Sequence, residues 1–324
     1  MTPAASGALR PTLGLILPTT LEKEFPAGTG NTFGATPGTA AELTEICRQA
    51  EATGADSLWA VDHLFWPQPI NEALTTLAIA AAATRRPILG TCVLQLPLRH
   101  PAALAKQAAA LQLLSDRRFI LGLGVGSHEG EYQRAGVDFH RRGRLMDEGI
   151  AAMREAWAAP PEPESAYRLE PVSPRVPIWI GGASPAAIRR TAAVADGWVP
   201  LFISAAEYGP ALRTLRQETE RAGRDPDAVE PAVVVFARVG RDGEAQERGI
   251  RWLSELYGIP GKAFERHLVA GTSEMCATSL ARFVEAGARH IVIMVAGANA
   301  VQHFGYLRSA FLARAETVFS GVPV

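Results

Sequence analysis

The stretch "RFILGLGVGSHEGEYQR", residues 118–134, begins as an apolar strand and ends among ionisable groups. Glycine occupies every second position at the end of the apolar run, at Gly122, Gly124 and Gly126. Glycine weakens a strand interior, so this spacing indicates that another group must approach the backbone closely. We expect either a neighbouring strand at a barrel corner or a flat ligand to lie against these glycines.

Similar short apolar runs recur along the chain and alternate with Ala-rich amphipathic segments. The predicted strands are 12–18, 56–62, 87–95, 118–125, 176–182, 196–201, 232–239 and 289–296. The predicted helices are 38–54, 71–85, 100–116, 140–158, 184–195, 204–223, 243–257 and 272–287. Near-continuous apolar runs are typical of parallel strands covered on both faces. The alternation therefore predicts an α/β protein with a (β/α)₈ barrel.

A doubly wound sheet is the alternative arrangement of the same elements, but "GLGVGS" does not match the G-x-G-x-x-G fingerprint of dinucleotide binding. The length of 324 residues suits one barrel domain over residues 1–324. Two long loops interrupt the alternation. We expect loop 19–37 to cover the active-site face, and the Pro-rich insertion 159–175 to serve packing or oligomer contact on the opposite face.

Composition excludes several functional classes. The chain is 48% hydrophobic and 20% charged, with a formal net charge of −1, so nothing indicates binding to nucleic acid or to an acidic membrane. No apolar run reaches the roughly 18 residues of a membrane span. The three cysteines, Cys47, Cys92 and Cys276, lie far apart without metal-ligand spacing. We expect reduced thiols and a cytoplasmic protein.

The catalytic groups of a barrel come from the C-terminal ends of its strands. The second strand ends at Asp62 and His63, with Trp66 close behind, and the fifth ends at Gly181-Gly182 before Ser184-Pro185 opens a helix. Two glycines and the free N–H groups of a helix start suit a phosphate. An ordinary turn with an N-cap serine is the alternative.

The residues after the fourth strand were tested against hydrolytic motifs. "HEGEY" resembles the zinc motif H-E-x-x-H, but Tyr132 replaces the second histidine, so we expect no metal. No G-x-S-x-G elbow is present. What remains is a carboxylate at a glycine-rich strand end, suited to hydrogen bonding or proton transfer. A solvated loop acid is the alternative.

Four segments together resemble the bacterial luciferase-like family of flavin and deazaflavin oxidoreductases. They are "AEATGADSLWAVDH", "ILGTCVLQLPLRHP", "GLGVGSHEGEYQRAGVDFHRRGRLMDEGI" and "PIWIGGASPAAIRRTAAVADGWVP". The resemblance implies a (β/α)₈ barrel that binds an isoalloxazine-type ring at its C-terminal mouth. It would explain the glycines of the fourth strand as the place where the flat ring enters.

Within that family, the Asp-His pair with a nearby tryptophan resembles the branch that uses the deazaflavin coenzyme F420, as in its glucose-6-phosphate dehydrogenases. The resemblance implies that His63 and Trp66 line the reaction centre and that Glu129 is the matching glutamate. His128 stands where that motif has glycine. We expect Glu129 to transfer the proton, His63 to orient the substrate or stabilise charge, and Glu131 to matter little.

The resemblance also implies which residues bind the cofactor. The resemblance implies a non-prolyl cis peptide bond at the end of the third strand, and we expect it between Cys92 and Val93. The expected cofactor-binding residues are Asp62, Cys92, Val93, Gly124, Gly126, Ser127, Gly181, Gly182, Ala183 and Ser184.

The sequence thus predicts an oxidoreductase that moves a hydride between F420 and a small organic substrate, and we expect a homodimer. One alternative is a monooxygenase that uses FMN, O₂ and reduced flavin from a separate reductase. Another is a flavin-binding barrel without enzymatic activity. A deazaflavin passes only a hydride, whereas a reduced flavin can activate oxygen, and in both cases the protein supplies orientation and electrostatics.

Overall fold

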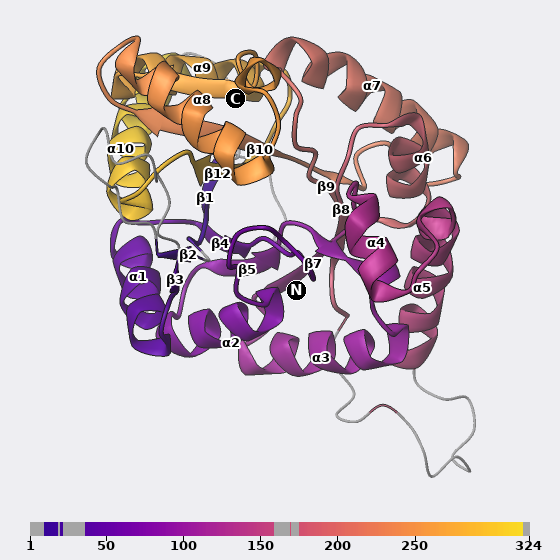
Figure 1. The fold of residues 1–324 in the computed structure, drawn as a ribbon. Helices are drawn as coiled ribbons and strands as arrows, with labels where there is room; N and C mark the ends of the chain where they lie inside the picture. The colour runs from indigo at the N-terminus through magenta and orange to yellow at the C-terminus, as the bar shows by residue number, and fades with distance from the viewer. Residues whose placement is uncertain (1–9, 19, 22–35, 159–168, 170–174, 320–324) are drawn as a thin grey trace.

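The computed structural model describes residues 10–18, 20–21, 36–158, 169 and 175–319. The chain forms a ring of parallel strands surrounded by helices (Figure 1). Loops 19–37 and 159–175 lie almost entirely outside the described residues. Within the described part of the chain, no helix is both long and apolar enough to cross a membrane.

Eight strands close the ring and confirm the (β/α)₈ barrel. Around the ring they are β1 (Thr12–Ile16), β4 (Ser57–Ala60), β5 (Ile88–Thr91), β7 (Phe119–Gly124), β8 (Ile178–Ile180), β9 (Gly197–Trp198), β10 (Glu230–Val239) and β12 (His290–Val295). The first and last strands pair through Thr12 and His290. Short β6 (Leu94–Gln95) also pairs with β7, and β2 (Thr20–Leu21) pairs with β3 (Thr36–Pro37) outside the ring.

An outer layer of helices covers the ring. It consists of α1 (Ala40–Ala52), α2 (Ala73–Ala83), α3 (Pro101–Leu114), α5 (Arg142–Trp157), α6 (Pro185–Val194), α7 (Ala205–Arg221), α9 (Ser273–Glu285) and α10 (Ala300–Phe319). Short 3₁₀ turns occur at η1 (Leu96–Leu98), η2 (Phe139–Arg141) and η3 (Gly261–Ala263). Serine and threonine caps begin several helices: Ser184 Oγ, for example, accepts the Ala187 N–H at 3.2 Å.

Two helices lie inside the outline of this outer layer in Figure 1, namely α4 (Glu129–Ala135) and α8 (Glu244–Tyr257). The helix over 243–257 was predicted, but the strand that follows it, β11 (Leu268–Gly271), was not. β11 pairs in parallel with the C-terminal half of β10, on the same side as β9. The chain therefore inserts α8 and β11 between the seventh and eighth strands of the ring.

Two tryptophans fill the inside of the barrel. The rings of Trp59 and Trp179 lie 5.3 Å apart, and both side chains are buried. Glycines on neighbouring strands leave room for them, because a Cβ atom at Gly90 would lie 2.2 Å from Trp59 and one at Gly197 would lie 2.4 Å from Trp179. The barrel is thus a packed core below its C-terminal mouth.

A buried histidine closes the other end of this core. His290, 5% exposed, places its Nε2 2.8 Å from Ser57 Oγ and its Nδ1 2.6 Å from Thr12 Oγ1. Trp59 Nε1 donates to the same Ser57 Oγ at 2.6 Å. Burial lowers the pKa of His290 from about 6.5 to about 4, because the apolar surroundings disfavour the charged ring.

The structure explains the alternate glycines of β7 by a neighbouring strand. A Cβ atom at Gly122 would lie 1.9 Å from the carbonyl oxygen of Thr91, and one at Gly124 would lie 2.4 Å from Val93 Cγ2. The last residue of β5 and the segment that follows it thus lie directly over the two glycines. The peptide bond between Cys92 and Val93 in this segment is cis, which confirms the predicted position.

Replacing Gly122 with alanine is expected to lower the free energy of unfolding by about 2 kcal/mol, as for other overpacked core positions. The obstacle is a backbone oxygen, which cannot rotate away. Gly130→Ala is the matched control, because a Cβ atom there meets nothing within 4 Å. Urea unfolding of the two variants checks the difference, and equal stability would contradict it.

Candidate active site

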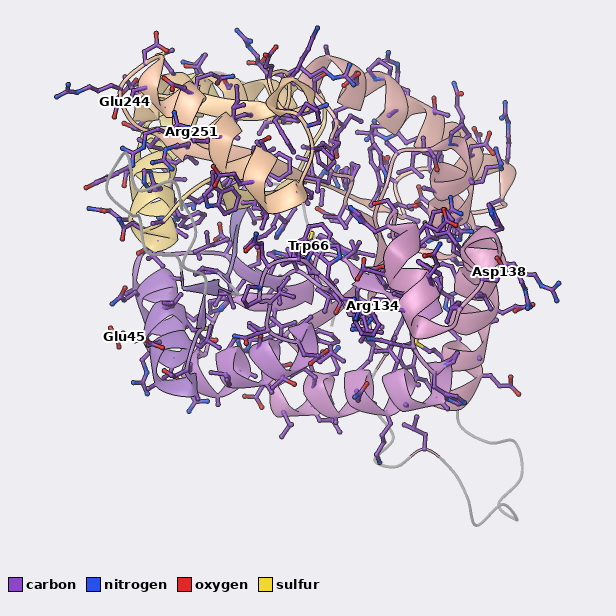
Figure 2. All side chains as sticks on the ribbon, viewed as in Figure 1. Glu45, Trp66, Arg134, Asp138, Glu244 and Arg251 are labelled. Atoms are coloured by element: carbon purple, nitrogen blue, oxygen red, sulfur yellow. The ribbon has the colours of Figure 1, made fainter. Side chains whose placement is uncertain are left out.

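A cavity of about 390 Å³ opens at the C-terminal ends of the strands. Its lining includes ten of the residues predicted for the site, which come together from β4, β5, β7 and β8: Asp62, His63, Trp66, Cys92, Val93, Gly124, Gly126, Ser127, Gly181 and Gly182. Trp66 lies at the centre of the face seen in Figure 2. Glu129, Ala183 and Ser184 are not part of the lining.

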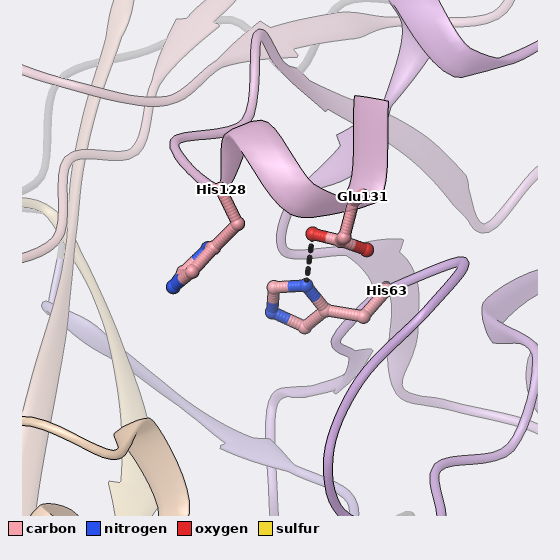
Figure 3. Close-up of side chains that lie close together, drawn as sticks. All are labelled: His63, His128 and Glu131. Carbon is pink, nitrogen blue, oxygen red and sulfur yellow. Dashed lines mark hydrogen bonds and ion pairs between the residues drawn. The ribbon is translucent and has the colours of Figure 1, made fainter. Parts of the chain in front are cut away.

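The central polar feature is a hydrogen-bonded pair between His63 and Glu131 (Figure 3). His63 Nδ1 lies 2.9 Å from Glu131 Oε2. The other carboxylate oxygen, Oε1, accepts the backbone N–H groups of Leu64 and Phe65 at 3.0 and 3.1 Å. Gln95 Nε2 donates to Oε2 at 3.1 Å. Glu131 is therefore held in one position by groups from two strand ends.

The surroundings of Glu131 favour its charged form. Burial alone would raise the pKa of this carboxyl, which is only 3% exposed. The hydrogen bond and charge of His63, with the bonds from Gln95 and Phe65, outweigh burial, so the pKa lies below its usual range. An ionised carboxylate only accepts hydrogen bonds, so the proton between the two side chains belongs to His63 Nδ1. The Nε2 atom is the ring nitrogen of His63 that Glu131 does not engage.

Glu129, to which the sequence analysis assigned proton transfer, lies elsewhere. It is the first residue of α4, is exposed, and accepts a 3.4 Å hydrogen bond from Gln133 Nε2 one turn along the same helix. The structure therefore does not bring Glu129 together with His63, and it places Glu131 in that position instead. Successive helix residues are rotated by about 100°, so two residues two positions apart point in nearly opposite directions.

Aromatic rings enclose the His63–Glu131 pair. His63 stacks on Trp66 with the ring centres 3.8 Å apart, and the ring of His128 stands edge-on to Trp66 at 4.8 Å. Burial lowers the pKa of His128, and the nearby His63 lowers it further while Glu131 opposes them. His128 therefore adds a mainly neutral ring to the cavity wall.

His63, His128 and Glu131 bring three possible metal-ligand atoms within 4.8 Å of one another. The two oxygens of Glu131 already accept four hydrogen bonds, one of them from His63. A metal ion that bound to Glu131 would have to displace at least one of these hydrogen bonds. The donor geometry fits a proton-carrying pair better than a metal centre.

Comparison with known proteins identifies the family. The family model described as luciferase-like monooxygenase matches residues 20–259, which is most of the chain. The chain belongs to the luciferase-like oxidoreductases. A relative from Mycobacterium kansasii, a phthiodiolone/phenolphthiodiolone dimycocerosates ketoreductase, is 32% identical over 256 residues, covering 67% of this chain and 70% of its own.

Solved structures share the luciferase-like barrel at low sequence identity. An F420-dependent secondary alcohol dehydrogenase in complex with an F420–acetone adduct superposes with a TM-score of 0.76 at 19% identity, over 93% of this chain and 99% of its own. A type II Baeyer–Villiger monooxygenase, the oxygenating constituent of 3,6-diketocamphane monooxygenase from Pseudomonas putida in complex with FMN, gives 0.68 at 17% identity, over 97% and 99%. These likenesses concern the fold.

The turn after β8 of this luciferase-like barrel offers backbone donors. The N–H groups of Gly182, Ala183 and Ser184 donate to none of the residues that the structure describes, whereas Gly181 N–H bonds to Leu123 O within the barrel. Trp198 Nε1 donates to the Gly182 carbonyl at 2.8 Å. Since the C=O and N–H of one peptide point in opposite directions, the Ala183 N–H faces away from Trp198.

Two predicted residues use their side chains within the fold, although one of them, Asp62, also lines the cavity. Asp62 accepts the Gln95 N–H at 3.0 Å and pairs with Arg99 at 2.5 Å, so its charge is compensated within the fold. The side chain of Ser184 caps α6, as expected for an ordinary turn with an N-cap serine. Only the backbone of Ser184 is therefore available to a ligand. The sequence analysis missed that Glu131 lies beside His63. Glu131 differs from Glu129 in directly preceding a fully buried residue, Tyr132.

Proposed function

We propose that this protein is an F420-dependent oxidoreductase that transfers a hydride between F420 and the carbonyl or alcohol carbon of a small organic substrate. The observation that carries the proposal is His63, which lines the cavity and is hydrogen-bonded to the buried Glu131. Adding a hydride to a carbonyl carbon requires a proton at the oxygen, and the reverse reaction must remove one. His63 is a proton carrier in a suitable place.

The residues of the cavity fit an F420-type or flavin-type group. Gly182 has a φ of +90° and lines the cavity, so its backbone lies open to a ligand. The unused N–H groups of Gly182, Ala183 and Ser184, at the start of α6, suit a phosphate. Gly124, Gly126, Ser127 and Val93 would line the ring. When bound, the cofactor supplies or accepts the hydride.

His63 would act through its Nε2 atom, and Glu131 would act as a positioning residue. The carboxylate keeps the proton on Nδ1, so Nε2 faces the substrate as a base when the ring is neutral and as an acid when it is protonated. Trp66 fixes the ring plane by stacking on it. The assignment differs from the one made from the sequence, in which Glu129 carried the proton.

The comparisons support this choice of chemistry. The curated relative at 32% identity is named a ketoreductase, and the alcohol dehydrogenase with the same barrel was solved with an F420–acetone adduct. Both names describe the interconversion of a carbonyl and an alcohol. Because a monooxygenase with the same fold binds FMN, FMN is the alternative cofactor for the present protein. A separate reductase would then have to supply the reduced flavin.

Titrating the purified protein with F420 and, separately, with FMN tests the proposal. We expect saturable binding of F420 and, with reduced F420 and a ketone, stoichiometric formation of the alcohol without O₂ consumption. Binding of FMN alone, with turnover that consumes O₂, would overturn the proposal in favour of the monooxygenase. Binding of either cofactor without turnover of any carbonyl or alcohol would favour a cofactor-binding barrel.

Gly182→Val is expected to weaken cofactor binding about tenfold or more, equal to at least about 1.4 kcal/mol. A valine at a φ of +90° would distort the turn that presents the N–H groups. Gly223→Val is the matched control, because Gly223 also has a positive φ, of +74°, but lies exposed at the end of α7. Cofactor titration and thermal unfolding of both variants separate the two effects, and equal affinities would remove the phosphate assignment.

A further inference from the structure

The order of strands divides the cavity into two sides. The glycines proposed to receive the cofactor lie at the ends of β7 and β8, and in a ring of eight strands these lie opposite β12 and β1. On the β12–β1 side the lining is apolar. It consists of Ile16 at the end of β1 with Leu17 and Pro18 after it, and of Met294, Val295 and Gly297 from β12 and the turn that follows it.

Helix α8 extends this apolar side over the mouth. Trp252, Leu256 and Tyr257 line the cavity, and Trp252 and Leu256, four residues apart, lie on the same face of the helix. The other face carries ion pairs one turn apart, such as Arg251 with Glu247 at 2.6 Å. Glu244 and Arg251 are labelled in the upper left of Figure 2, away from the central Trp66.

The lining offers little to a charged substrate. Among the described residues it contains no lysine or arginine, and its one carboxylate, Asp62, is already paired with Arg99. Burial raises the pKa of Tyr257, and nearby Cys92 adds to this, so its phenol stays neutral. A phosphate or carboxylate group buried on this side would lose its water without gaining a lysine or arginine from the described part of the chain, which is costly.

We infer that the β12–β1 side of the cavity and the inner face of α8 form a substrate wall that selects uncharged, predominantly apolar ketones or secondary alcohols. The oxygen of such a substrate lies at His63, and its hydrocarbon part lies against Leu256 and Met294. Sugar phosphates and carboxylic acids are excluded. The inference rests on the proposed function and adds to it the class of substrate.

The effect is measurable as a chain-length dependence. Burying one methylene group contributes about 0.8 kcal/mol, or roughly a fourfold gain in affinity. For the cofactor-saturated enzyme, we expect the Kd of 2-alkanones to fall about fourfold per methylene from butanone until the cavity is filled. We expect carboxylates of equal length to bind at least about 100-fold more weakly.

Calorimetric titration of the full-length protein with both ligand series tests the wall. Leu256→Asp is expected to weaken octan-2-one binding at least about tenfold while leaving cofactor affinity unchanged. Arg251→Asp, on the exposed face of the same helix, is the control and should bind the ketone as the unmodified protein does. If the Leu256→Asp protein does not fold, Leu256→Ala takes its place in the test. For this variant we expect the affinity for 2-alkanones to increase less with each methylene group than it does for the unmodified protein.

Equal affinity for ketones and carboxylates, or no dependence on chain length, would overturn the inference. Its failure is distinguishable from failure of the proposed function. Turnover of F420 with a sugar phosphate and not with a ketone would refute the substrate wall alone. Tight ketone binding without hydride transfer from reduced F420 would refute the proposed function and leave the wall in place.

Discussion

Glu131→Gln is expected to reduce turnover by roughly 10²–10⁴-fold while the affinity for the cofactor stays within about a factor of two. The substituted amide keeps the size of the side chain but removes its charge. It can also donate to His63 Nδ1, which would leave the proton on Nε2 and give the ring the wrong tautomer for a base. The loss should therefore appear in kcat, with little change in the KM of the substrate.

Glu129→Gln is the matched control, since Glu129 lies on the same short helix but is exposed. It should retain nearly full activity. Steady-state kinetics, cofactor titration and thermal unfolding of both variants distinguish a chemical from a structural role. If Glu129→Gln were inactive and Glu131→Gln active, the assignment made from the sequence would be right and the one made from the structure wrong.

The second large effect concerns the pH dependence of stability. The pKa of His290 is about 4 in the folded protein and about 6.5 when the ring is free in water. Between these values the unfolded chain binds a proton that the folded protein does not, so acidification favours unfolding. The contribution of neutral His290 is fully present above pH 6.5 and is lost towards pH 4, a change of about 3 kcal/mol.

His290→Gln should lose this part of the pH dependence, because an amide does not titrate. We expect the variant to be less stable at pH 7.5, and to lose roughly 2–3 kcal/mol less than the unmodified protein between pH 7.5 and 4.5. His140→Gln, at an exposed position, is the control and should keep the full pH dependence. Identical pH profiles of urea unfolding for His290→Gln and the unmodified protein would contradict the role of this burial.

The barrel could be predicted from the sequence because each of its eight strands is a short apolar run covered on both faces. Several elements were not predicted, among them β11, α4 and α10. β11 is only four residues long and is half-exposed at two of them, so it has no strong apolar signal. α4 begins within a polar segment that has no apolar periodicity, and α10 lies beyond the last predicted strand, 289–296.

The site could be predicted as a set of strand ends, and most of its residues do line one cavity. The choice between Glu129 and Glu131 could not be made, because it depends on the phase of a two-turn helix whose presence was not predicted. The alternate glycines were ambiguous for a related reason. A missing side chain indicates a close approach, and only coordinates distinguish the carbonyl of Thr91 from a ligand.

Because α8 and β11 are inserted between two strands of the ring, the residues proposed to contact the substrate on α8 are separate from the strands that close the barrel. The ring closes through β1, β12, β10 and β9, and none of these pairings involves α8. The inner face of α8 can therefore be exchanged without altering the hydrogen-bonded frame that holds His63 and Glu131. In evolution, as in enzyme engineering, this helix is the part of the molecule where a new substrate range can arise while the reaction stays the same.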